Sequence, residues 1–366
     1  MRKVNEIRIG DRLYSRWFLE QDSGQRALAY AHREKVEVVC LCNNIPIHVA
    51  HAKNFFLRRN PGTGSLHAMS CPSFTQDDIE AGSTHTVKHQ AVERDNGTIK
   101  IIPGFPAPHF AGITPPATPP DGLTLGDLLR LLWREAGLNI WRDTTAVRDW
   151  AFVREKLDKV TGRVTLHGGG LMGRFILIPR PFDANKVNEL TQERDVWLTK
   201  FRVPATGGVF IVAGILKSHS QTRNNNTAIQ IKHMAEEQII CSTDVAAQIE
   251  EATIGGACSV FVLASVRCSG QYLIGDKVAL LSVTRKEMLP VAHKADLLLT
   301  ELLVERGRHF IKPISINGGE LDGAFLTDCA GGKRIGFKGA APAGAISVSI
   351  DLLGLELPAV SAISHK

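Results

Sequence analysis

Seven prolines lie close together near the end of the first third of the chain, and they restrict its fold more than any other feature. They are Pro103, Pro106, Pro108, Pro115, Pro116, Pro119 and Pro120. Proline has no backbone N–H and a fixed φ, so such a run cannot continue a helix or a central strand. We therefore expect an extended linker over 103–121. It would separate an N-terminal β module (1–102) from a helical segment (122–162) and a C-terminal α+β domain (163–366).

Composition excludes several classes of protein. With 44% hydrophobic and 22% charged residues, the chain has the composition of a soluble globular protein rather than a disordered or collagen-like one. No apolar run approaches the ~20 residues of a membrane span, and the N-terminal residues lack the apolar core of a signal peptide. The seven cysteines are too few and too unevenly spaced for a secreted disulfide framework. We therefore expect a cytoplasmic protein that does not bind a membrane.

The strongest chemical pattern is a set of four potential metal ligands. Cys40 and Cys42 lie at i and i+2 at the end of a predicted strand, while His67 and Cys71 lie at i and i+4. The first pair points to one side of an extended chain, and the second pair shares one face of a helical turn. A predicted hairpin over 45–59 would bring the two pairs together. Three thiolates and one imidazole complete a tetrahedral structural zinc site that has no open position for water.

Other interpretations of these residues are open at this stage. Cysteines at a strand end are often buried simply as small apolar side chains, and His67 would then be a solvated histidine. His48 and His51 are spare candidate ligands, although His48 should be exposed on its strand. Thiolate-rich sites also bind iron, and the sequence does not distinguish iron from zinc.

Positive charge is concentrated at the N-terminus. Residues 1–70 contain eleven Lys or Arg and six Asp or Glu, and 11 − 6 = +5 is most of the net charge of +6. A basic module of this kind favours DNA, RNA or an acidic protein as a partner, although a solvated surface is the alternative. We expect Lys53, Arg58 and Arg59 of the predicted hairpin to contact phosphate. The sequence does not specify the oligomeric state.

The pattern of apolar residues predicts an α+β fold. It comprises a small zinc-ribbon-like N-terminal β module, a helical segment, and a larger C-terminal mixed or antiparallel sheet with packed helices. Helices are predicted from Leu125, after the N-cap Thr124, to Gly137, and at 144–160, 242–251 and 292–306. Strands are predicted at 36–42, 45–51, 54–59, 163–167, 174–178, 208–216, 227–232, 257–266, 271–274, 277–283, 309–316, 323–326, 334–337 and 345–350.

A metal-dependent nuclease is the alternative function. The C-terminal region carries Glu301, Asp322, Asp328 and Lys333 on a predicted helix and strands. Acids and a lysine on such a core can hold Mg²⁺ beside a scissile phosphate. The usual carboxylate-x-lysine pair is missing, however, because four residues separate Asp328 from Lys333. A simple amphipathic helix and turn explain these residues as well.

Two further motifs have simpler explanations. The glycine-rich stretch 168–173 matches G-x-G-x-x-G, but a strand-like segment follows it where a dinucleotide site needs a helix. We therefore interpret it as a turn. The two helices predicted after the prolines could form a helix-turn-helix, with arginines on phosphate. We favour a helical hairpin packed through Trp133, Trp141 and Trp150.

The sequence resembles a bacterial family, the domain of unknown function 1173. The similar motifs are Cys40-Leu41-Cys42, 47–50, 58–64, His67 and Cys71, then 131–139, 308–313 and 326–328. The resemblance implies that Cys40, Cys42 and Cys71 form a unit and that the protein is carried by mobile genetic elements. It implies no reaction. We therefore expect a non-catalytic accessory protein with a structural zinc site that binds nucleic acid or a protein partner.

Overall fold

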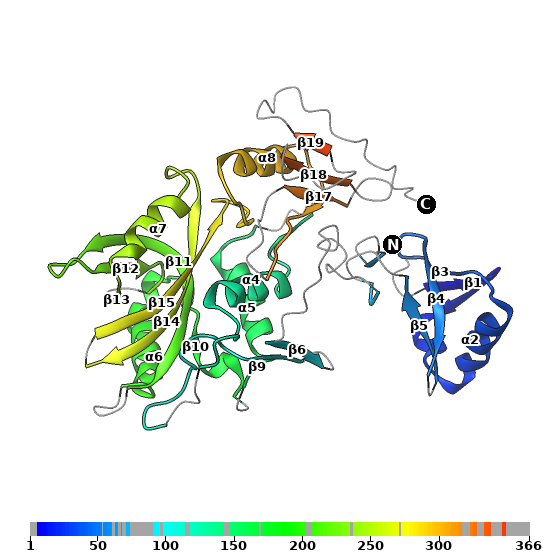
Figure 1. Cartoon of the computed structure of the whole chain (residues 1–366), viewed down its shortest axis with the longest axis horizontal. Coiled ribbons are helices and arrows are strands. Elements are labelled where there is room, and N and C mark those ends of the chain that lie inside the picture. Colours follow the sequence, from blue (N-terminus) through cyan, green and yellow to red (C-terminus); the bar gives the residue numbers. More distant parts are fainter. Residues whose placement is uncertain are drawn as a thin grey trace.

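The structure is a computed structural model in which helices and strands mix in several sheets (Figure 1), which confirms the α+β class. It describes residues 6–52, 54–60, 63–64, 67, 71–73, 91–95, 98–113, 118–142, 147–167, 170–202, 207–234, 237–270, 272–316, 323–327, 333–337 and 346–348. Among these residues, no helix combines the length and the apolar character needed to cross a bilayer.

The N-terminal unit, blue in Figure 1, is an antiparallel sheet with the order β2-β1-β3-β4-β5. Its elements are β1 (Glu6–Ile9), β2 (Arg12–Ser15), α1 (Arg16–Leu19), α2 (Asp22–Glu34), β3 (Val38–Cys40), β4 (Ile45–His51) and β5 (Phe55–Arg59). Helix α2 buries Leu28 and Ala31 in the same core as Ile47 and Val49 of β4. The unit therefore contains helices that the sequence analysis did not predict, in addition to the expected strands.

The largest sheet closes into a ring of hydrogen-bonded strands. Its elements are β11 (Val209–Gln221), β12 (Thr227–Ile231), β13 (Gln238–Cys241), α7 (Asp244–Ala252), β14 (Ser259–Ser269) and β15 (Tyr272–Val283). The ring runs β11-β12-β13-β15-β14 and returns to β11; only the β13–β15 pair is parallel. Strand β11 takes part twice, because its first half pairs with β14 and its second half with β12. The two strands predicted over 271–283 form the single strand β15.

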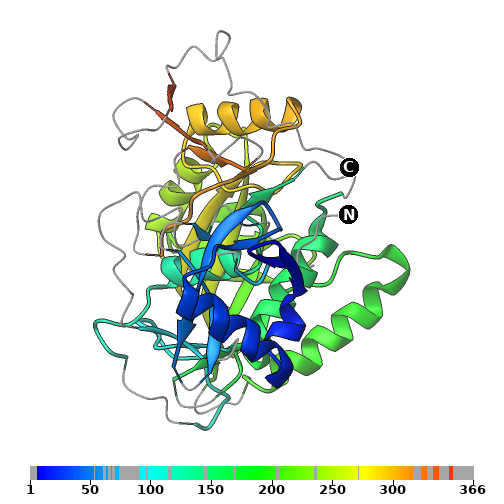
Figure 2. The same ribbon diagram turned by 90° about the vertical axis from the view of Figure 1, so that its right-hand side faces the viewer.

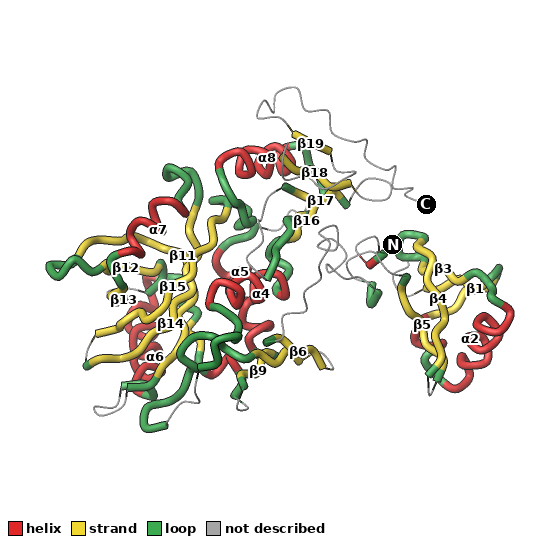
Figure 3. Tube along the Cα trace, viewed as in Figure 1, coloured by secondary structure: helices red, strands yellow, loops and turns green. Residues whose placement is uncertain are grey.

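Helices cover one side of this ring (Figure 3). The covering helices are α4 (Leu125–Glu135) and α5 (Trp150–Thr161). A third helix, α6 (Val187–Thr199), follows them in the chain. Thr124 caps α4 as predicted, accepting a hydrogen bond from the Asp127 N–H, and Trp133 packs edge-on against Phe261 of β14. Helix α5 begins six residues later than predicted because Asp149 is its N-cap.

The proline-rich segment packs onto this body over its described residues. Phe105 is 2% exposed and belongs to the core that also contains Leu123 and the ring strands. Pro103 pairs with Leu123, and His109 pairs with Val209 at the start of β11. A small sheet contains β6 (Val92–Asp95), β7 (Thr98–Ile101) and β9 (Val164–Leu166). Its first two strands precede the proline-rich segment in the sequence, and the third follows it. One hydrophobic core therefore spans the predicted linker, the helical segment and much of the C-terminal domain.

Two motifs of the sequence analysis lie in this body. Met172–Arg174 is a short 3-10 turn, and the strand β10 (Ile176–Leu177) follows it on the edge of the ring. After the described glycines Gly170 and Gly173, the chain continues as a strand, as the sequence analysis expected, and Gly168 and Gly169 lie outside the described residues. Between α4 and α5, the strand β8 (Ile140–Trp141) intervenes, and Arg148 donates to the carbonyls of Leu138 and Ile140 instead of facing solvent as a phosphate-binding arginine would.

A second, smaller sheet lies under the helix α8 (Lys294–Glu305), which is orange in Figure 2. Its order is β19-β18-β17-β16-β8. The strands are β16 (Phe310–Ile311), β17 (Ala324–Leu326), β18 (Lys333–Phe337) and β19 (Ile346–Val348). Leu299 and Leu303 of α8 pack with Phe310 and Leu326 in a core separate from that of the ring.

Candidate metal centre

The turn between β3 and β4 brings the first two cysteines together. Strand β3 ends at Cys40, which pairs with Ile45 at the start of β4. The turn at 41–44 closes through Asn44, whose φ of 55° lies in the left-handed region that asparagine tolerates. The backbone N–H of Leu41 donates to the Glu6 carbonyl, which fixes the turn against β1. The strand end therefore bends as the sequence analysis required, and both thiols face the same point.

His67 and Cys71 complete the group from the segment after the hairpin. Cys71 is 4% exposed and lies in the same core as Cys40 and Cys42, and His67 is 2% exposed. Ser73, two residues after Cys71, accepts a hydrogen bond from the Arg16 side chain at 2.8 Å. This contact ties the second ligand pair to the start of α1.

The four side chains are arranged as metal ligands. Their ligand atoms all lie within 4.8 Å of one another. The Sγ of Cys40 is 3.4 Å from that of Cys42 and 3.5 Å from that of Cys71, and the His67 Nδ1 is 3.3 Å from the Cys42 Sγ. A disulfide needs about 2.05 Å between sulfurs. A tetrahedron with ~2.3 Å metal–sulfur bonds has edges of about 3.8 Å, close to the observed distances.

The cluster has unusual acid–base properties. Hydrogen bonds from Cys42 and then Cys71 hold the pKa of the Cys40 thiol well below its ordinary value, although burial opposes this. Burial disfavours the charged form of His67, but its contacts with Cys40 and Cys71 outweigh burial and raise its pKa to about 9. The Ser73 backbone N–H also donates to the Cys71 Sγ. The Cys40 side chain therefore already favours thiolate, the form of cysteine that binds a metal.

The burial of the four candidate ligands is also consistent with a metal site. All four residues are buried, and the Nε2 atom of His67 is buried without a hydrogen-bond partner in the described part of the chain. A buried cluster of three sulfurs and one ring nitrogen can hold a metal ion, and a closed set of four ligands serves structure rather than catalysis.

The predicted phosphate-binding residues are divided between two faces of the hairpin. Arg58 is exposed and lies opposite the exposed His48, whereas Arg59 is half-buried opposite Ile47. Lys53 lies outside the described residues. The sequence analysis missed Phe56, which is 44% exposed and shares the outer face with Arg58. The signal was the i, i+2 spacing of Phe56 and Arg58 on a strand.

Of the four residues of the nuclease alternative, the structure describes the side chain of one. Glu301 is an exposed residue of α8. Asp322 and Asp328 lie outside the described residues, and Lys333 is described only as part of the backbone of β18.

A buried charged network near α8 escaped the sequence analysis. Lys312 and Asp296 are both fully buried and form an ion pair. The Lys312 Nζ also donates to the Thr300 Oγ1 at 3.2 Å, and the Gly323 N–H donates to the Asp296 Oδ1 at 3.1 Å. The Ala292 N–H donates to the other carboxylate oxygen. The signal in the sequence was a lysine directly after the apolar pair Phe310–Ile311, which no local pattern links to Asp296.

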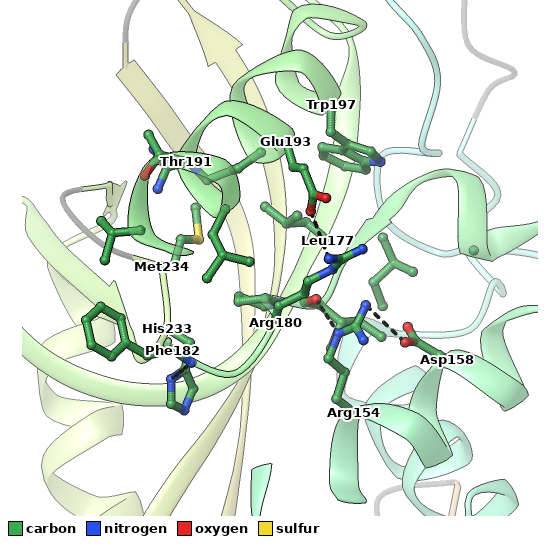
Figure 4. Close-up of a pocket in the computed structure, with 17 residues that line it drawn as sticks. Arg154, Asp158, Leu177, Arg180, Phe182, Thr191, Glu193, Trp197, His233 and Met234 are labelled. Carbon is green, nitrogen blue, oxygen red and sulfur yellow. Dashed lines mark hydrogen bonds and ion pairs between the residues drawn. The ribbon is translucent and has the colours of Figure 1, made fainter. Parts of the chain in front are cut away.

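A cavity of about 270 Å³ opens beside β10, between α5 and α6 (Figure 4). Its apolar wall includes Leu177 and Trp197. Its cations are neutralised, because Arg154 pairs with Asp158 at 3.2 Å and Arg180 pairs with Glu193 at 3.3 Å. The described lining therefore favours no charged ligand.

Comparison with known proteins places the chain in a family. A family profile described as "Protein of unknown function (DUF1173)" matches residues 12–329. The chain belongs to the DUF1173 family. This confirms the resemblance seen in the motifs, and the match spans the metal-ligand cluster and the ring of strands. No curated protein and no solved structure matches this DUF1173 chain.

Proposed function

We propose that this DUF1173 protein binds one structural Zn²⁺ ion through Cys40, Cys42, His67 and Cys71, and that the ion holds a nucleic-acid-binding hairpin in shape. The observation that carries the proposal is that four buried ligand atoms lie within 4.8 Å of one another. Three cysteines and one histidine are a common structural zinc set. Zinc has no redox chemistry, which suits a closed buried site better than iron.

The hairpin β4–β5 supplies the contact surface. Helix α2 packs on one face of the sheet, and the other face presents His48, Phe56 and Arg58. A cation beside an exposed aromatic ring suits both phosphate and base. Arg59 and Lys53 would add charge at the margins. The role is that of an accessory protein of a mobile element; an acidic protein is the competing partner, which the experiments below distinguish from nucleic acid.

Metal content tests the zinc site. The protein purified without added metal should contain about one zinc per chain by elemental mass spectrometry, and the Cys40→Ser, Cys71→Ser double variant should contain none, because two of four ligands are lost. Cys258→Ser is the matched control, since this buried thiol lies outside the Cys/His cluster and donates to the Ala252 carbonyl. Iron instead of zinc, or metal retained in the double variant, would contradict the proposal.

Nucleic-acid affinity tests the hairpin. We expect Arg58→Ala to weaken binding to DNA and to lower the slope of log K against log salt by about 0.7 to 0.9, the effect of one phosphate contact. Arg12→Ala, an exposed arginine on β2, is the control and should bind as wild type does. Equal affinities for the two variants, or binding only to an acidic protein, would refute this contact.

A further inference from the structure

The connectivity of the ring of strands is that of a known ligand-binding barrel. We number the strands of the ring 1 to 5 along the chain, from β11 as strand 1 to β15 as strand 5. Around the ring they follow the order 1-2-3-5-4-1, and strands 3 and 5 are parallel. Helix α7 lies between strands 3 and 4 in the chain. This is the connectivity of the oligonucleotide/oligosaccharide-binding (OB) barrel, which binds its ligands on the second and third strands and on the loops 1–2 and 4–5. A fold alone does not assign a ligand, so the side chains on this face decide.

The face that corresponds to this binding surface is partly exposed. Helix α4 packs on β14 and β15 on the other side of the barrel. On β12 and β13, by contrast, Gln230 is half-buried and Gln238 is exposed, while Ala228, on the same face as Gln230, is buried. The barrel therefore has one side covered by α4 and one partly exposed side, which we call the open face.

The side chains of the open face form a row across four strands. Ser218 pairs with Gln230, and Gln230 pairs with Gln238. One step before the Ile239–Leu273 pair, the register places Gln238 beside Tyr272. Tyr272 is 55% exposed at the loop 4–5 end of β15. Amide and hydroxyl groups beside an exposed aromatic ring suit the edges and the face of an unpaired base.

Positive charge borders this row. A groove of about 520 Å³ is lined by Lys217, His219, Lys232 and Arg285, and Asp and Glu are absent from its lining as far as the chain is described. The groove shares Ser218 with the row of polar residues. Lys217 and Lys232 have no ion-pair partner within the described ranges. Just beyond the C-terminal end of β11, the exposed Arg223 lies in the loop between β11 and β12. A groove of this charge favours a polyanion over a neutral oligosaccharide.

We propose that the open face of the barrel, from the groove at Lys217 and Lys232 to Tyr272, binds single-stranded nucleic acid. The backbone phosphates lie along the lysines, and an unpaired base stacks on Tyr272. A duplex would leave the ring of Tyr272 without a base face, so a single strand is preferred. The inference deepens the proposed function, because nucleic acid is the ligand in both, but it depends on different residues.

Fluorescence anisotropy with the full-length, metal-containing protein tests this face. The probes are labelled (dT)20, (U)20 and a 20-base-pair duplex. We expect Tyr272→Ala to weaken (dT)20 or (U)20 binding about tenfold, the effect of one lost stack, and Tyr272→Phe to bind as wild type. We expect Lys217→Ala with Lys232→Ala to lower the salt slope by about 1.4, the effect of two phosphates on a single strand. The two single-stranded probes distinguish DNA from RNA.

Matched variants separate the possible outcomes. Tyr30→Ala, an equally exposed tyrosine on α2, and Lys200→Ala with Lys294→Ala should bind as wild type does. If the barrel variants bind single strands as wild type does while Arg58→Ala does not, the barrel proposal is overturned and the hairpin proposal stands. The reverse result supports the barrel and refutes the hairpin. Equal affinity for duplex and single strand also overturns the barrel proposal.

Discussion

Removal of the proposed zinc ion with a chelator should unfold the N-terminal unit and leave the barrel folded. The four ligands would join the end of β3 and the turn after it to residues 67 and 71, within the core that also contains Ile7, Leu19 and Val38. Structural zinc contributes on the order of 10 kcal/mol of apparent binding free energy, which is comparable to the whole stability of a small unit. Without the ion, three thiols and an imidazole would remain buried against each other.

Hydrogen exchange followed by mass spectrometry measures this effect region by region. Amides of β3 and β4 should lose protection after chelation or in Cys40→Ser, while amides of β11 and β14 should keep it as an internal control. Unchanged protection of β3 and β4 in protein shown to be free of metal would contradict a structural role for the ion.

Lys312→Met should destabilise the region of α8 by about 3–5 kcal/mol. The variant leaves the Asp296 carboxylate buried without its cation, and an uncompensated buried charge has a cost of this size. Replacing both partners, with Asp296→Leu added, should recover much of the loss because no charge then remains buried. Lys294→Met, at an exposed position of the same helix, is the control and should change the free energy of unfolding by less than about 0.5 kcal/mol.

Urea unfolding followed by tryptophan fluorescence measures these free energies, because Trp141 packs against the core under α8. A similar midpoint for Lys312→Met and Lys294→Met would show that the buried pair does not stabilise the fold. No local sequence pattern links these two residues, because positions 296 and 312 meet only when β16 packs under the helix.

Local patterns predicted the elements whose determinants are local. The strand at 45–51 alternates buried and exposed residues and was predicted with its observed bounds. Thr124 marked the start of α4, because its side chain caps the helix by accepting a hydrogen bond from the N–H of Asp127, three residues later. The clustering of the four candidate ligands was predicted in the same way, because their spacing within 32 residues restricts how the chain can bring them together.

Other elements depend on contacts that a local pattern does not contain. Helix α2 was missed because its buried face consists of Gly24, Leu28 and Ala31, which give a weak apolar signal. Gly24 lies so close to the Phe18 carbonyl that a Cβ would be 2.2 Å from its oxygen, so only packing explains this glycine. The closure of the barrel was also missed, because it depends on the pairing of β11 with β14 and of β13 with β15.

The double use of β11 has a consequence for synthesis on the ribosome. Its first half, Val209 to Ile215, is buried throughout, yet its partner β14 begins only at Ser259. Until β14 emerges, this apolar stretch has one exposed strand edge and no cover on that side. Such an edge pairs readily with other chains. The nascent DUF1173 chain is therefore most prone to aggregation while the residues between these two strands are being made.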